Sequence, residues 1–93
     1  RLTPEMRKVA PNIARILNES KEYAKSHTVG ETEKYVVDAI NSYDGMEIEY
    51  YQIVDGISLE HLTSWDETGY AVGCVTVYCG DVRLIDNITY FNN

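Results

Sequence analysis

The spacing of apolar residues changes near Asp44-Gly45, and this change most limits the folds open to the chain. Before it, apolar and small residues recur every three or four positions, which is typical of amphipathic helices. After it, stretches rich in Val, Ile and Tyr with partial alternation are typical of strands. Helices that precede and are segregated from strands favour an α+β domain. A length of 93 residues fits one domain, 1–93.

The first half of the sequence predicts two helices, at about 4–26 and 31–43. Thr3 has the hydroxyl of a good N-cap, and Pro4 suits the first helical position. Pro11 interrupts the pattern, so either a short helix ends before it and another begins, or one helix bends there. Gly45 can adopt the left-handed conformation that ends the second helix.

The second half predicts three strands, at about 47–54, 70–79 and 82–90. Gly80-Asp81 is typical of a hairpin turn between the last two. Asp55 can cap one helical turn in "ISLEHL", and a polar loop follows around Trp65. The simplest arrangement is a two-layer α+β domain, with the N-terminal helices packed on one face of a three-stranded antiparallel sheet.

A formal net charge of −7 argues against nucleic acid and anionic membranes as partners, because a nucleic-acid-binding domain needs a basic face. No apolar run approaches the roughly 20 residues that span a bilayer. We therefore expect a cytoplasmic protein. Cys74 and Cys79 are five positions apart in one predicted strand, which places them on opposite faces. Buried free thiols in a reducing compartment follow from this placement.

No pattern of catalytic or metal chemistry stands out in the sequence. His27, His61 and the two cysteines lack the spacing of zinc ligands, and no G-x-S-x-G or glycine-rich phosphate loop is present. His61 could meet Cys74 or Ser58 only through tertiary contact. Gly73, inside a predicted strand, indicates a bulge or a close approach of other groups. We therefore expect no catalytic, cofactor-binding or metal-binding residue in this chain.

Eight tyrosines support a second interpretation, in which a tyrosine-rich sheet of a stand-alone acidic module binds a protein partner. A small hydrolase that uses His61 or the carboxylates ranks well behind.

The segment "GDVRLIDN" at 80–87 carries more charge than a strand needs. Alternation places Arg83 on one face of the strand and Asp86 on the other. Asp and Asn at such positions can bond neighbouring backbone groups. We expect Arg83, Asp86 and Asn87 to form a structural polar clasp.

Three segments carry a resemblance to a known family: "LTPEMRKVAP" at 2–11, "IEYYQIVDGISLEHL" at 48–62 and "GDVRLIDNI" at 80–88. Together they resemble the C-terminal domain of the pantothenate synthetases, or pantoate–β-alanine ligases. The last segment is the most specific, and Arg83, Asp86 and Asn87 belong to it. The stretch "YYQIV" departs from the smaller aliphatic residues usual in the family.

The resemblance implies an ATP- and Mg²⁺-dependent ligase that forms pantoyl adenylate and then joins it to β-alanine, releasing AMP. In that family ATP and pantoate bind mainly in an N-terminal domain with an H-x-G-H motif. A Ser-Arg-Asn stretch precedes Leu-Thr-Pro-Glu there, and the C-terminal domain resembles a lid. This chain has neither motif, so no catalytic residue carries over.

The resemblance also implies a setting for this chain. We expect it to be part of a longer, homodimeric enzyme and to be inactive in isolation. Residues Arg1, Leu2 and Thr3 would lie next to the interdomain hinge.

Overall fold

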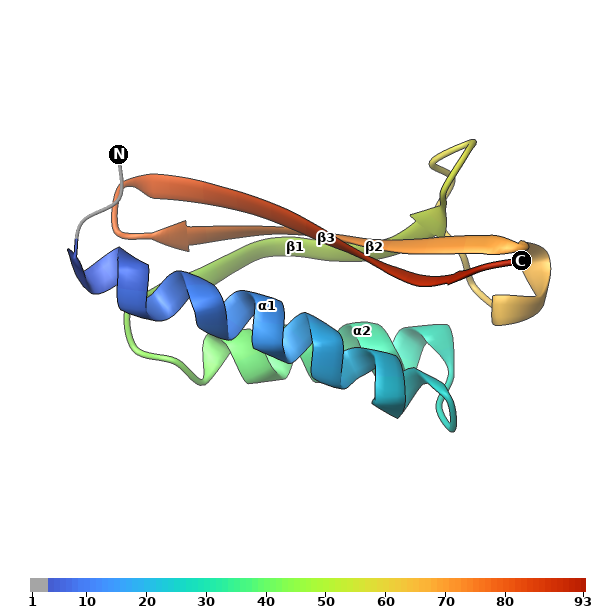
Figure 1. The fold of residues 1–93 in the computed structure, drawn as a ribbon, viewed down its shortest axis with the longest axis horizontal. Helices are drawn as coiled ribbons and strands as arrows, with labels where there is room; N and C mark the ends of the chain where they lie inside the picture. Colours follow the sequence, from blue (N-terminus) through green and yellow to red (C-terminus); the bar gives the residue numbers. More distant parts are fainter. Residues whose placement is uncertain (1–3) are drawn as a thin grey trace.

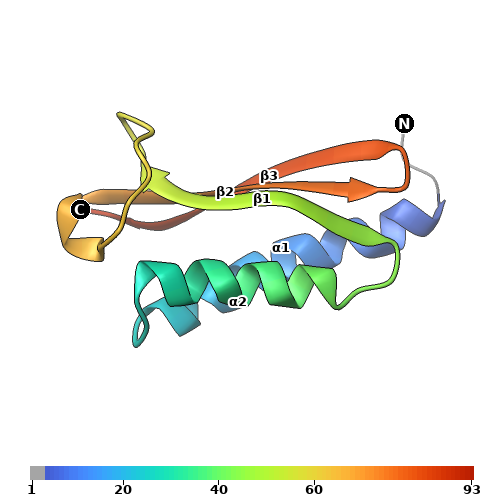
Figure 2. The same ribbon diagram turned by 180° about the vertical axis from the view of Figure 1, so that it is seen from behind.

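The computed structural model describes residues 4–93 and has two layers. Helices α1 (Pro4–Ala24) and α2 (Val29–Asn41) form one layer. Strands β1 (Met46–Asp55), β2 (Tyr70–Cys79) and β3 (Val82–Asn92) form the other. The strands are antiparallel in the order β1-β2-β3, and both helices cover the same face of the sheet (Figures 1 and 2). This confirms the predicted α+β architecture.

Helix α1 is a single helix that continues through Pro11. Of the two alternatives for this proline, the continuous helix is therefore the one found. Its buried stripe faces the sheet and consists of Ile13, Ile16, Leu17 and Ser20. The N-cap expected at Thr3 lies outside the described residues.

Helix α2 begins at Val29, two residues before the predicted start, because Thr28 is its N-cap. The Glu31 backbone N–H donates to Thr28 Oγ1 at 3.1 Å, and the Thr28 N–H donates to the Glu31 carboxylate at 2.9 Å. This reciprocal capping box satisfies two helix-end donors. The helix ends at Asn41, and the chain then turns at Gly45, whose φ of +87° suits glycine.

Alternation along β2 separates the two faces of the sheet. Val75, Val77 and Cys79 are buried against the helices, whereas Cys74 lies on the opposite, open face and is half-buried. Both thiols are free, and burial raises the pKa of each. The expectation of opposite faces holds, but only Cys79 is fully buried.

A bulge in β1 decides which of the two consecutive tyrosines of "YYQIV" faces the core. The register with β2 shifts between Ile48 and Tyr50. As a result Tyr51 points into the core and is 6% exposed, while Tyr50 is 41% exposed. Strict alternation from the inward Met46 and Ile48 would have turned Tyr50 toward the core, but the bulge adds one residue to β1 and turns Tyr51 inward instead.

The connection from β1 to β2 differs from the expected helical turn. Residues 57–62 form no helix. Instead the Asp55 carboxylate accepts the backbone N–H groups of Ile57 and Ser58, which tightens a non-helical turn. One 3₁₀ turn, Trp65–Glu67, follows in the polar loop. In the described part of the chain, no helix has the length and apolar character needed to cross a bilayer.

Candidate functional site

The three residues of the β3 signature do not converge on one point. Arg83 and Asn87 pair with Tyr78 and Cys74 of β2 on the open face, whereas Asp86 pairs with the buried Val75. Successive strand residues point to opposite faces, so the side chains divide between the two sides of β3. A shared catalytic centre of these residues is incompatible with this arrangement.

Arg83 forms an ion pair that spans the middle strand. Its Nε donates to Glu49 Oε1 of β1 at 3.0 Å. The bond and charge of Glu49 raise the pKa of Arg83 above its ordinary value. The two side chains are 46% and 39% exposed, so solvent screens the pair and its stabilisation is small. Arg83 therefore ties β3 to β1 across the open face.

Asp86 faces helix α1 and makes a local contact. Its Oδ1 accepts the backbone N–H of Asn87 at 2.8 Å. A shallow groove of about 330 Å³ separates α1 from this part of β3, with Lys21 of α1 among its lining residues. The Asp86 carboxylate therefore holds the backbone N–H of the next residue within the strand.

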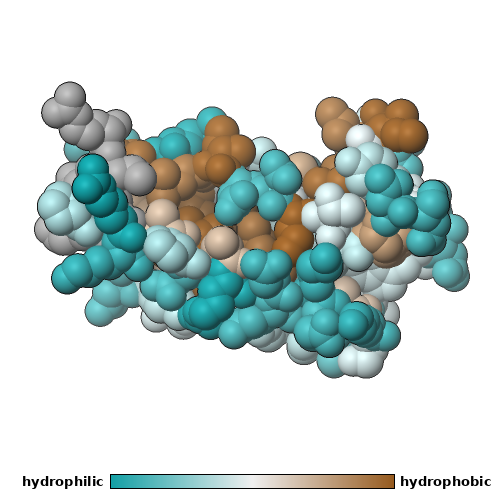
Figure 3. All heavy atoms as spheres, in the orientation of Figure 1, coloured by the Kyte–Doolittle hydropathy of each residue, from teal (hydrophilic) through white to brown (hydrophobic). Residues whose placement is uncertain are grey.

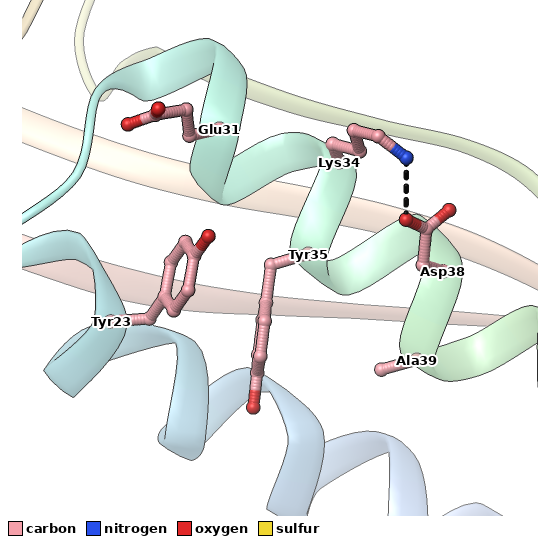
Figure 4. Close-up of a pocket in the computed structure, with 6 residues that line it drawn as sticks. All are labelled: Tyr23, Glu31, Lys34, Tyr35, Asp38 and Ala39. Atoms are coloured by element: carbon pink, nitrogen blue, oxygen red, sulfur yellow. Dashed lines mark hydrogen bonds and ion pairs between the residues drawn. The ribbon is translucent and has the colours of Figure 1, made fainter.

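A larger groove of about 560 Å³ lies between the two helices (Figure 4). The Tyr23 ring stacks on Tyr35 at 4.4 Å and on His27 at 3.6 Å. On its rim Lys34 Nζ lies 2.7 Å from Asp38 Oδ2, and Asp38 raises the pKa of Lys34. The groove is therefore bordered by stacked aromatic rings and by an exposed ion pair whose two charges cancel.

Trp65 anchors the β1–β2 connection at the far end of α1. Its Nε1 donates to the His27 carbonyl at 2.8 Å, and its ring packs against Tyr90 and Phe91. Lys21 and the aromatic cluster line a small cavity of about 140 Å³. The lone tryptophan gave no such signal in the sequence, because its partners lie far away along the chain.

The His61 side chain bonds to Glu33 of α2 rather than to Cys74 or Ser58. Its Nε2 lies 2.7 Å from Glu33 Oε2, and the same oxygen accepts the Ile53 N–H at 2.9 Å. The Leu62 N–H donates to the Ile53 carbonyl at 2.9 Å. Glu33 and the 61–62 segment therefore cover the outer edge of β1, which protects it from pairing with other chains.

Metal ions find no matching group of ligands among residues 4–93. No three His, Cys, Asp or Glu side chains gather there in a group that could hold a metal ion.

Comparison with known proteins identifies the family of the chain. The family model described as pantoate-beta-alanine ligase matches residues 1–89. The chain belongs to this family, as the sequence resemblance predicted.

Individual relatives agree with this assignment. The chain is 53% identical to the pantothenate synthetase of Phocaeicola vulgatus and 51% identical to that of Bacteroides fragilis, over 97% of its length in both cases. It spans only 32% of each relative. A crystal structure of pantothenate synthetase from Thermus thermophilus matches with a TM-score of 0.84 and 31% identity, over 97% of this chain and 32% of that one.

Proposed function

We propose that the chain is the C-terminal lid domain of a cytoplasmic, ATP-dependent ligase that condenses pantoate with β-alanine through pantoyl adenylate. The observation that supports this most is the family match over residues 1–89, in a chain that spans only about a third of its relatives. The partner is then the nucleotide-binding domain of the same polypeptide. The complete enzyme would bind ATP with Mg²⁺, pantoate and β-alanine, and form a homodimer.

In this proposal the domain acts by closing rather than by supplying a reacting group. An acyl adenylate is an activated acyl group that water can hydrolyse, so a lid that excludes water protects it until the amine arrives. The geometry supports a role of this kind, because His61 is engaged with Glu33 and the signature residues divide between two faces. The chain alone should therefore be inactive.

The signature residues Arg83, Asp86 and Asn87 receive a scaffold role in the same proposal. Arg83 ties the outer strands together, and Asp86 holds the backbone of Asn87. Arg83→Gln in the full-length enzyme should lower stability only slightly, since the pair is exposed and screened by solvent. A large loss of kcat without loss of stability would contradict a scaffold role. Residues Arg1, Leu2 and Thr3, proposed to adjoin the hinge, lie outside the described residues.

The decisive experiment measures AMP release from ATP, pantoate and β-alanine. It compares the isolated 93-residue chain with the full product of its gene, at equal concentrations. We expect AMP and pantothenate from the full product and none from the chain alone. Turnover by the chain alone would refute its role as an inactive lid, and an inactive full product would refute the ligase assignment.

The stand-alone acidic module is the second candidate, and the open sheet face favours it. Tyr50 and Ile85 flank Thr76 on that face and are 41% and 67% exposed. A free-standing module should bind a protein partner through this face with the isolated chain alone, and Tyr50→Ser with Ile85→Ser should abolish binding.

A further inference from the structure

Two large apolar side chains stand exposed at the tip of the loop that follows β1. Ile57 is 85% exposed and Leu59 is 68% exposed. Hydrophobic atoms project from the body at the corner where this loop lies (Figures 1 and 3). Single exposed apolar residues are normal, but two at one projecting tip indicate a contact surface.

The tip is held out by its own backbone contacts. Asp55 Oδ1 accepts the N–H groups of Ile57 and Ser58, both at 2.8 Å, and the Leu59 N–H donates to the Asp55 carbonyl at 2.9 Å. The hydroxyl of Thr68 donates to the other Asp55 oxygen. These bonds fix the turn in place, so Ile57 and Leu59 are not free to fold back onto the sheet.

Leu59 also has a backbone conformation that leucine rarely adopts. Its φ of +65° lies in the left-handed region, and among residues 4–93 it is the one non-glycine residue there. This conformation is unfavourable for a side chain with a Cβ. The stability of the fold does not favour a leucine at this position. An apolar contact with another surface does favour one.

The tip lies at the end of the domain opposite to the start of α1. Helix α1 begins beside the Gly80–Asp81 hairpin, and the 56–60 loop projects at the other end of the sheet (Figure 1). The long axis of the domain measures 40 Å. If a preceding domain is joined at α1, closure about that joint moves this end of the domain, and the loop with it, through a large distance.

We propose that Ile57 and Leu59 form a latch, the contact that holds the lid closed. On closure they insert into an apolar pocket on the preceding nucleotide-binding domain. This inference rests on the proposed function. About two thirds of each relative lies outside the part that this chain matches, which provides a partner surface within one polypeptide. A fixed apolar tip at the far end of the lid engages that surface only on closure.

The test uses the full product of the gene and the variants Ile57→Ser and Leu59→Asn. Asn tolerates the left-handed conformation better than Leu, so the second variant keeps the turn while removing the apolar group. With ATP and pantoate bound, we expect amides of 56–60 to be protected from hydrogen exchange in the wild type and unprotected in both variants. We also expect kcat/KM to fall by at least about tenfold, because buried apolar contact at closure is lost.

The matched control is Glu60→Gln, which changes an exposed side chain of the same loop and leaves both apolar groups in place. It should leave exchange at 56–60 and kcat/KM unchanged. The urea midpoint for unfolding of the isolated chain should be the same or higher in the latch variants. This result would show that the variants fold.

The outcomes separate the latch from the function on which it rests. An active wild type with unaffected latch variants would overturn the latch alone, whereas an inactive wild type would overturn the proposed function. Equal losses from Glu60→Gln would overturn the assignment to Ile57 and Leu59. Self-association of the isolated chain that Ile57→Ser abolishes would overturn it too, since the occupant would then be a second copy.

Discussion

The hydroxyl groups of Tyr51 and Tyr90 are hydrogen-bonded to each other and join the two outer strands above the middle strand. Ser20 of α1 extends this contact, with its Oγ 2.8 Å from the Tyr90 hydroxyl. The space for it exists because residue 73 of β2 is glycine. A Cβ at Gly73 would overlap the Tyr51 hydroxyl oxygen. The glycine anticipated from sequence as a point of close approach therefore admits two tyrosines.

Gly73→Ala should be strongly destabilising. The added methyl group overlaps the Tyr51 side chain, and overpacking of a buried site costs about 1–3 kcal/mol. Urea unfolding of the isolated chain measures the loss. Gly69→Ala, where a Cβ would meet nothing within 4 Å, is the control and should change stability little. In the double variant Gly73→Ala, Tyr51→Phe, part of the loss should be recovered, because the overlapping oxygen is gone.

Stability should fall steeply at alkaline pH. Burial raises the pKa of both Tyr51 and Tyr90 above the ordinary tyrosine value. The folded state then keeps protons that the unfolded state releases, so stability is full below about pH 10 and declines above it. Each tyrosine contributes a slope of up to ~1.4 kcal/mol per pH unit.

Urea unfolding across this range, with tyrosinate absorbance as a second signal, checks the expectation. Tyr90→Phe should flatten the slope, whereas Tyr50→Phe, at an exposed position, should not. Equal slopes in all three proteins would contradict the assignment to the buried pair.

Acid should weaken the turn after β1. The Thr68 hydroxyl and the N–H groups of Ser58 and Ile57 lower the pKa of Asp55 to about 2. Because this pKa lies below the unfolded value, Asp55 stabilises the fold above about pH 4 and loses that effect as pH falls toward 2. Asp55→Ala should lower stability at neutral pH and flatten the acid dependence between these limits.

Thermal unfolding at a series of pH values measures this difference. Asp44→Asn, a change at an exposed position after α2, provides the comparison and should retain the acid dependence of the wild type. A flat profile for the wild type itself would show that Asp55 is not the group that titrates.

Removal of the α2 cap should cost a moderate amount of stability. Thr28→Ala deletes the oxygen that accepts the Glu31 N–H, and loss of an N-cap typically costs about 1 kcal/mol. Thr28→Ser retains the hydroxyl and should restore most of the loss. If Ala and Ser behave alike in urea unfolding, the capping bond contributes nothing.

Periodic segments were predictable from the sequence because their signal is local. The strand expected at 70–79 lies at Tyr70–Cys79, where β-branched and aromatic residues are dense. Thr28 also has the sequence signature of a cap, since Glu31 follows three residues later, but Glu31 was predicted only as the start of the helix. The two-residue error at the beginning of α2 follows from this.

Contacts between distant segments were not predictable in this way. Glu33 reaches His61 over 28 positions, and Arg83 reaches Glu49 over 34. Alternation could place Arg83 on a face but could not name its partner. The bulge between Ile48 and Tyr50 likewise depends on pairing with β2 rather than on the sequence of β1 alone.

The close approach of Tyr51 and Tyr90 to Gly73 of β2 also limits which substitutions the family can accept. A side chain at position 73 would occupy the same space as the hydroxyl group at position 51. A substitution at one of these positions therefore requires a change at the other. We expect positions 51, 73 and 90 to be replaced as a set among relatives. Lineages that acquire a larger residue at 73 should already have exchanged the tyrosine pair for smaller, apolar side chains.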